Sequence, residues 1–143
     1  MVDPGRLREL LDRLSQELRH LSRLAGYPAE ELLADADRLA AVKYRFVVAA
    51  EICIDVGQHI IASEGLRAPA SFADVFTVLG EAAFLPAELT TALEDMARFR
   101  NLLVHGYARV DDRRVVEILH TRLDDFARFI AEVARMASAE CLD

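Results

Sequence analysis

The sequence predicts an all-α protein, an antiparallel helical bundle with four long helices and one short helix. Apolar residues recur at helical spacing along almost the whole chain, whereas the alternating pattern of β-strands is nearly absent. The chain has 143 residues, of which 53% are hydrophobic, and this length suits one domain with a sizeable core. We therefore expect a single helical domain over residues 1–143.

The first predicted helix begins at Asp3-Pro4, because proline is favoured in the first turn of a helix. Gly26 ends it. Between these points the apolar residues advance by alternating steps of four and three, which places them on one face. This face consists of Leu7, Leu11, Leu14, Leu18 and Leu21.

A second and longer helix is predicted from Pro28 to about Ser63, and its apolar residues lie on more than one face. One stripe contains Leu39, Val42, Phe46, Ala50, Cys53, Gly57 and Ile60, and another contains Val48, Ile52 and Val56. A helix that is apolar on several sides is either central in a bundle or shared with a partner chain. We expect this helix to be the centre of the fold.

Three further helices complete the predicted bundle. Residues 64–70 form a loop, after which a capping pattern at Ser71 starts a short helix through Leu79. Pro86 starts a fourth helix that ends near Gly106, and Asp111-Asp112 caps a fifth. The fifth helix carries the stripe Val116, Leu119, Leu123, Phe126, Ile130, Val133 and Ala137.

Composition excludes several classes of protein. The first residues lack the basic and apolar regions of a signal peptide, and two cysteines cannot build a disulfide framework. Charged residues interrupt the most apolar stretch, Ala40 to Ile61, so we expect no membrane span and no membrane partner. Cysteine and histidine show no close metal-ligand spacing. We expect a cytoplasmic protein with no metal and no cofactor.

The formal net charge of -7 argues against a protein that coats nucleic acid through its overall field. Any site for a polyanion must therefore be local. One window qualifies, since it holds five arginines against two aspartates. It contains Arg98, Arg100, Arg109, Arg113 and Arg114, with Asp111 and Asp112.

Arg100 is the most informative anomaly in this window. On an ideal helix it lies about 20 degrees from Leu89, in the middle of the apolar stripe of the fourth helix. A guanidinium there must pair with a carboxylate, extend to an edge, or face a cleft that binds an anion. One alternative is a structural ion pair to Glu51 or Asp55 of the long second helix.

His105 follows five residues later, just before Gly106 and Tyr107. A histidine at a helix C-terminus is also favoured by the helix dipole, so stability alone can explain it. Together, however, arginine and histidine suffice to cleave RNA without metal, because the 2′-hydroxyl is an internal nucleophile. The two side chains point about 140 degrees apart on a straight helix. Either the turn at Gly106 swings His105 round, or two copies of the chain pool their groups.

Residues 100–107, Arg-Asn-Leu-Leu-Val-His-Gly-Tyr, resemble the R-x4-H-x-Y signature of HEPN domains, and the chain is similar to the HepT family of toxin ribonucleases. The resemblance covers most of residues 28–136, including the segment from Lys43 to Ala62. It implies a helical bundle that acts as a homodimer, an RNA endonuclease toxin of a toxin–antitoxin pair.

The resemblance also implies roles for single residues. Arg100 and His105 would be catalytic, and Asn101 would help to position the histidine. Tyr107 would receive AMP from a cognate nucleotidyltransferase antitoxin of the MntA type, and the added charge would silence the toxin. We expect contact with the RNA substrate to be confined to the arginine-rich window, through Arg98, Arg109 and Arg113.

Two other functions remain open. The chain can be a non-catalytic HEPN subunit that binds nucleotide or a nucleotidyltransferase partner, or a plain structural bundle in which Arg100 is fully paired. Two minor patterns carry less weight. Glu117 and His120 have the spacing of di-iron sites but no second copy, so we expect them on a solvated flank. Asp55 and His59 can bond to each other or approach Arg100.

Overall fold

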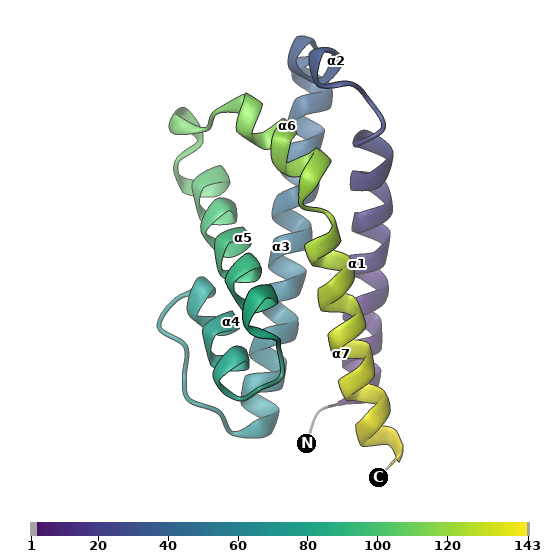
Figure 1. Ribbon diagram of the computed structural model, residues 1–143, viewed down its shortest axis with the longest axis vertical. Helices are drawn as coiled ribbons and strands as arrows, with labels where there is room; N and C mark the ends of the chain where they lie inside the picture. The colour runs from purple at the N-terminus through teal and green to yellow at the C-terminus, as the bar shows by residue number, and fades with distance from the viewer. Residues whose placement is uncertain (1–2, 143) are drawn as a thin grey trace.

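The computed structural model describes residues 3–142 and the side chains of residues 3–139, and within that range it is all-helical. The elements are α1 (Pro4–Leu24), α2 (Ala29–Ala34), α3 (Ala36–Glu64), α4 (Phe72–Glu81), α5 (Ala87–His105), the 3-10 turn η1 (Tyr107–Arg109), α6 (Asp112–Thr121) and α7 (Asp124–Leu142). The four predicted long helices are α1, α3, α5 and α7. Figure 1 shows them running along the bundle, with α6 across one end.

The structure has three short helices where one was expected, because two predicted helices are each broken. The helix predicted from Pro28 is interrupted at Asp35, whose side chain caps α3 by accepting a hydrogen bond from the Arg38 amide at 3.1 Å. The helix predicted from Asp111 is interrupted at Arg122, whose backbone leaves the helical region. Apolar periodicity continues across both breaks, so periodicity alone could not reveal them.

The helix starts predicted at Asp3 and Ser71 are confirmed by their caps. The Asp3 side chain accepts hydrogen bonds from the amides of Gly5 and Arg6, at 3.0 and 3.2 Å. Ser71 accepts from the amide of Asp74 at 3.0 Å and so begins α4. These bonds satisfy amides that have no partner within their own helix.

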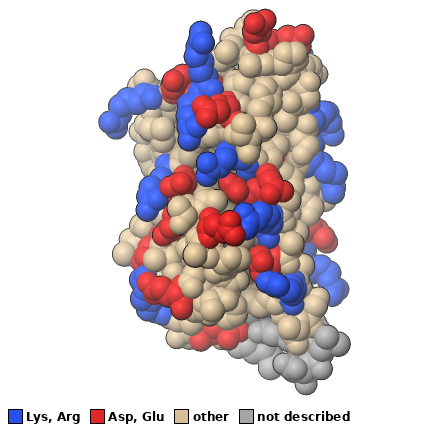
Figure 2. Space-filling view, viewed as in Figure 1, with Lys and Arg blue, Asp and Glu red and all other residues tan. Residues whose placement is uncertain are grey.

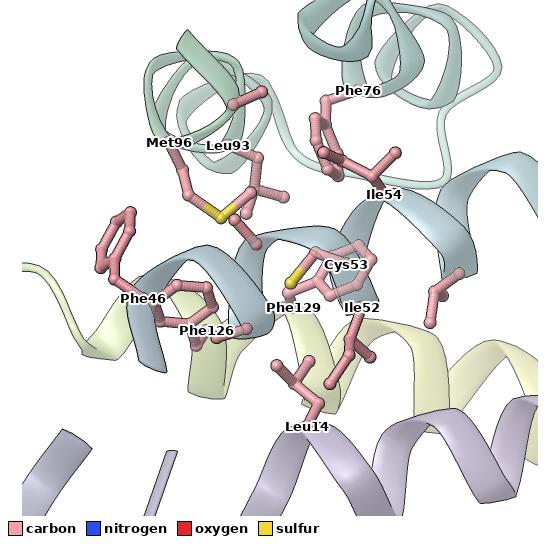
Figure 3. Close-up of a cluster of buried hydrophobic side chains, with 14 of the residues drawn as sticks. Leu14, Phe46, Ile52, Cys53, Ile54, Phe76, Leu93, Met96, Phe126 and Phe129 are labelled. Atoms are coloured by element: carbon pink, nitrogen blue, oxygen red, sulfur yellow. The ribbon is translucent and has the colours of Figure 1, made fainter. Parts of the chain in front are cut away.

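Helix α3 is the centre of the bundle, as predicted. It packs against α1, α2, α4, α5 and α6. In Figure 3 its side chains point to different sides, with Leu14 of α1 on one side and Leu93 of α5 and Phe76 of α4 on the other. Phe46 lies edge-to-face against Phe126 of α7, with ring centroids 5.5 Å apart. The apolar faces of α3 are therefore covered within one chain.

Helix α3 also corrects an expectation about membranes. By length and composition it can cross a membrane, because a window that avoids Lys43 and Arg45 holds no more than two charged residues. The expectation that no window would qualify is therefore wrong. However, 56% of that window is buried inside the protein, as in the core helix of a bundle. Cys53 lies in this buried part, and burial raises the pKa of its thiol.

A glycine contact holds α4 close to α3. A Cβ atom on Gly57 would lie 2.4 Å from Cγ1 of Val75, which is closer than two carbon atoms can approach. Glycine therefore permits the short distance between these helices. This contact fixes the position of α4, whose first residue, Phe72, reaches towards α5.

Candidate functional site

Arg100, on α5, lies where α3, α4 and α5 meet, and its side chain is only 11% exposed. Its Nη2 donates a hydrogen bond to Oε1 of Glu51 at 2.7 Å, and its Nη1 donates to Oδ1 of Asn101 at 3.1 Å. The guanidinium carbon also lies over the ring of Phe72, 5.0 Å from the ring centroid. Of the two carboxylates considered as partners, Glu51 is therefore the one that pairs.

This pairing does not satisfy Arg100 completely. Its Nε is buried and has no hydrogen-bond partner among the described residues. The Glu51 side chain is 47% exposed, so the ion pair opens to solvent on the glutamate side. Buried side-chain donors normally have a partner, so this Nε calls for an explanation. The pair with Glu51 is the structural ion pair named above as an alternative, and it leaves Nε without a partner among the described residues.

Asn101 and His105 share one face of α5 and line the same cavity, with a volume of about 540 Å³. The other walls come from α3, from the loop before α4 and from the first residue of α4. The lining residues are Gln58, Pro69, Ala70, Ser71, Phe72, Asn101 and His105. None of them is acidic, although the chain as a whole is. None of them is Lys or Arg either, so the cation available to an anionic ligand is Arg100, which lies behind Phe72 and Asn101.

Arg100 itself does not line this cavity, but it touches two residues that do, Phe72 and Asn101. His105 is the last residue of α5, is exposed, and has no hydrogen-bond partner among the described residues. Its backbone is still helical, so the turn after it does not swing it towards Arg100. Within one chain, Asn101 accepts a hydrogen bond from Arg100 and lines the same cavity as His105.

Gly106 ends α5 by donating its amide hydrogen to the carbonyl of Leu102 at 2.8 Å. A Cβ atom there would lie 2.8 Å from Cδ1 of the Leu102 side chain, so glycine allows the chain to turn closely past α5. Tyr107 follows in η1 and is 78% exposed. Its hydroxyl is therefore accessible, close in sequence to His105.

The arginines of the basic window have different surroundings. Arg109 and Arg113 are exposed, and their guanidinium groups form no ion pair with the described residues. Arg98 pairs with Asp95 at 3.3 Å and lines a different cavity of about 440 Å³ between α5, α6 and α7. In Figure 2, basic side chains project beside the α5–α6 connection at the upper left, whereas acidic and basic side chains are mixed over the rest of this face.

The remaining candidate residues have structural partners. Nε2 of His59 accepts a hydrogen bond from the Asp3 amide at 3.2 Å, so His59 contacts the start of α1 and neither Asp55 nor Arg100. Nε2 of His120 lies 3.0 Å from the carbonyl oxygen of Tyr27, and Glu117 pairs with Arg114. Both are exposed, as expected. Within residues 3–139, no group of three or more metal-ligating side chains could hold a metal ion.

Sequence reasoning missed the two residues that complete the cavity, Phe72 and Gln58. The capping pattern at Ser71 predicts where α4 starts, but not that its first residue meets α5. Gln58 is a polar residue of α3, and the apolar stripes that predict this helix do not include it. Neither residue belongs to a sequence pattern that predicts its place in the cavity, because that place depends on how the helices pack.

The loop that forms one wall of the cavity is held by an exposed cluster of charges. Arg67 donates two hydrogen bonds to Asp74, at 2.8 and 2.9 Å, and two to Glu81, both at 3.0 Å. Asp74 also accepts from the Ala70 amide at 2.8 Å. These bonds from Arg67 lower the pKa of Asp74 to about 2 and also lower that of Glu81. We refer to Arg67, Asp74 and Glu81 as the loop clamp.

Comparison with known proteins identifies a family and several similar proteins. A family model described as Ribonuclease HepT-like matches residues 14–133. An mRNA nuclease HepT from Shewanella oneidensis is 35% identical over 80 residues, which are 56% of this chain and 60% of the relative's length. A tRNA nuclease HepT from Aphanizomenon flos-aquae is 20% identical over 134 residues, which cover 92% of this chain and 90% of that protein.

Solved structures share the fold. A tri-AMPylated HEPN toxin of Shewanella oneidensis, solved in complex with an MNT antitoxin, superposes with a TM-score of 0.85 and 24% identity over 94% of this chain and 99% of that one. YutE from Bacillus subtilis, a cytosolic protein of unknown function, superposes with a TM-score of 0.84 and 16% identity, covering 97% and 93% of the two chains.

Proposed function

The chain belongs to the Ribonuclease HepT-like family, and we propose that it is the toxin of a toxin–antitoxin pair, a cytoplasmic endoribonuclease that needs no metal. One observation carries this proposal. A guanidinium with an unsatisfied donor, Arg100, touches two residues of an acid-free cavity onto which the imidazole of His105 opens. An arginine and a histidine suffice for RNA cleavage by the internal 2′-hydroxyl.

The reaction follows from these groups. The 2′-oxygen attacks the adjacent phosphorus and forms a 2′,3′-cyclic phosphate, while the bond from phosphorus to the 5′-oxygen breaks. His105 takes the proton of the 2′-hydroxyl, and the imidazolium so formed gives this proton to the leaving 5′-oxygen. Arg100 exchanges Glu51 for the phosphoryl oxygens, whose negative charge grows in the transition state. Asn101 holds Arg100 beside the cavity until the phosphate arrives. Arg109 and Arg113 contact neighbouring phosphates, and Arg98 joins them once it releases Asp95.

The active form in this proposal is a homodimer. Three large apolar side chains are exposed near the end of α5, although Leu102 and Val104 point to different sides of the helix: Leu102 is 39%, Val104 37% and Tyr107 78% exposed. Burial of such side chains against a second copy is favourable. A two-fold axis near this end brings the two copies of His105 and Arg100 to one cleft. The second copy then supplies either Arg100 or His105, since these two side chains of one helix do not point at the same phosphate.

Regulation in this proposal acts through Tyr107. An antitoxin of the nucleotidyltransferase type transfers AMP from ATP: the tyrosine oxygen attacks the α-phosphorus, a new oxygen–phosphorus bond forms, and pyrophosphate leaves. The exposure of Tyr107 makes its hydroxyl reachable for such an enzyme. The added phosphate then lies two residues from His105 and repels the phosphate backbone of RNA.

Cleavage of labelled RNA in the presence of EDTA tests the proposal. The full chain is expected to cut RNA, but not an oligonucleotide with a 2′-deoxyribose at the cut position. His105→Ala and Arg100→Ala are expected to lower the rate at least about 100-fold, while His20→Ala, a histidine of α1, keeps it. Equal rates for wild type and His105→Ala would contradict the catalytic assignment.

The second candidate is a binding subunit that does not cut RNA. The observation that favours it is the 2.7 Å bond between Arg100 and Glu51, which neutralises the guanidinium in the free chain. In that case the purified protein binds nucleotide or a nucleotidyltransferase partner and leaves RNA intact. The same cleavage experiment separates the two candidates.

A further inference from the structure

We propose that the cavity between α3, α4 and α5 binds an unpaired RNA base next to the cleaved phosphate, with Phe72 as the stacking surface and Gln58 as the side chain that reads the base edge. This inference rests on the proposed RNA cleavage and names how the substrate is held. It identifies a binding subsite that depends on tertiary packing and lies outside residues 100–107.

Phe72 has the properties of a stacking surface. Its ring is 37% exposed and lines the cavity that Asn101 and His105 also line. The guanidinium of Arg100 lies over the ring, which fixes the ring in place, and the start of α4 is fixed by the contact of Gly57 with Val75. A rigid exposed ring loses little entropy on binding, and unpaired bases commonly stack on aromatic side chains.

Gln58 supplies hydrogen bonds that a stacking ring cannot. Its side chain is exposed at the cavity and has no hydrogen-bond partner among the described residues. An amide offers both donors and an acceptor, so it can pair with the edge of a base. Because Gln58 and Phe72 line the same cavity, one base can contact both.

Electrostatics favours this cavity over the one between α5, α6 and α7. That cavity contains Asp95 and Asp125, which pair with Arg98 and Arg122, and its third arginine, Arg114, pairs with Glu117. A nucleotide there must compete with these carboxylates. The cavity with Phe72 has no carboxylate, and its volume of about 540 Å³ is typical of ligand sites. A base bound there places its own phosphate beside His105.

Stacking is tested with an RNA that cannot be cleaved, carrying 2′-O-methyl groups at every position and one 2-aminopurine. Stacking quenches the fluorescence of 2-aminopurine, so binding of wild-type protein is expected to quench it. Phe72→Leu is expected to abolish the quenching and to raise the Kd about tenfold. Phe72→Trp is expected to retain the quenching and the wild-type Kd, because it keeps an aromatic ring. Tyr44→Leu is the matched control, since Tyr44 is an aromatic residue of α3 that is 63% exposed and does not line the cavity.

Base reading is tested by sequencing the products cut from a pool of random RNA. The wild type is expected to prefer one base at the position next to the cut, and Gln58→Ala to reduce that preference at this position alone.

Three results separate this inference from the proposed function. If wild type cuts RNA but Phe72→Leu binds and quenches equally, the base subsite is wrong and the cleavage stands. If the RNA binds and is quenched through Phe72 but nothing is cut, the cleavage is wrong and the subsite stands. If RNA is neither bound nor cut, both are wrong.

Discussion

Arg100 and Glu51 are joined at 2.7 Å across α5 and α3, and the glutamate is the more exposed of the two. The guanidinium is therefore neutralised by a carboxylate that solvent can reach. In the proposed function a phosphate takes the place of Glu51 on Arg100, and this exchange gives the first prediction.

We expect Glu51→Gln to strengthen the binding of non-cleavable RNA, because Arg100 no longer has to give up an ion pair to reach the phosphate. The slope of log Kd against log salt concentration should stay about the same, since Arg100 contacts one phosphate in both proteins. Glu17→Gln is the matched control: Glu17 pairs with Arg45 at 3.0 Å between α1 and α3, away from the cavity. An unchanged Kd for Glu51→Gln would contradict the exchange of partners.

We expect two inactive variants to complement each other if the active form is a dimer with pooled groups. Arg100→Ala and His105→Ala, refolded together, should recover part of the RNA cleavage that each lacks alone. Size-exclusion chromatography with light scattering shows whether mixed dimers form. Mixed dimers without activity would mean that each site is built from a single chain.

We expect the full chain to gain AMP on Tyr107 when it is produced together with its nucleotidyltransferase antitoxin. Intact-mass measurement and peptide mapping should find the adduct in wild type and none at this position in Tyr107→Phe. Tyr44→Phe should still be modified, because it removes a different exposed hydroxyl. The adduct should lower RNA cleavage. An adduct that leaves cleavage unchanged would argue against this form of silencing.

We expect Gly57→Ala to destabilise the protein by about 1–3 kcal/mol, because the added methyl group clashes with Val75. It should also weaken RNA binding, since α4 carries Phe72. The double variant Gly57→Ala/Val75→Ala removes the clashing Cγ1 atom. Thermal unfolding should therefore show a smaller loss than the sum of the two single variants. Simple additivity would indicate that α4 is free to move away from α3.

We expect the loop clamp to stabilise the protein at neutral pH and to fail in acid. The pKa of Asp74 is lowered to about 2 in the folded chain, from about 4 in an unfolded one. Because the folded state binds its proton less readily, the stabilisation is complete above pH of about 4 and is lost as the pH falls towards 2. Arg67→Gln should lower the melting temperature at pH 7, and the difference from wild type should shrink over this interval. A difference in melting temperature that stays the same as the pH falls would contradict a stabilising role of the loop clamp.

The sequence by itself determined what depends on neighbouring residues. The spacing of leucines, the caps at Asp3 and Ser71 and the turn at Gly106 are local, so they predicted the four long helices and most of their ends. The position of Arg100 within an apolar stripe left three alternatives open, one of them an ion pair to Glu51 or Asp55 of the central helix, and the structure shows the pair with Glu51. The breaks at Asp35 and Arg122 escaped prediction because the apolar pattern continues across them.

Only the tertiary structure decided how the cavity is completed. Phe72 and Gln58 are distant from residues 100–107 in the sequence, and no pattern in either segment specifies their contact with α5. Their positions follow from the short distance between α3 and α4, which the missing side chain of Gly57 permits. Periodicity shows which face of a helix is buried, but the partner of that face depends on packing among all the helices at once.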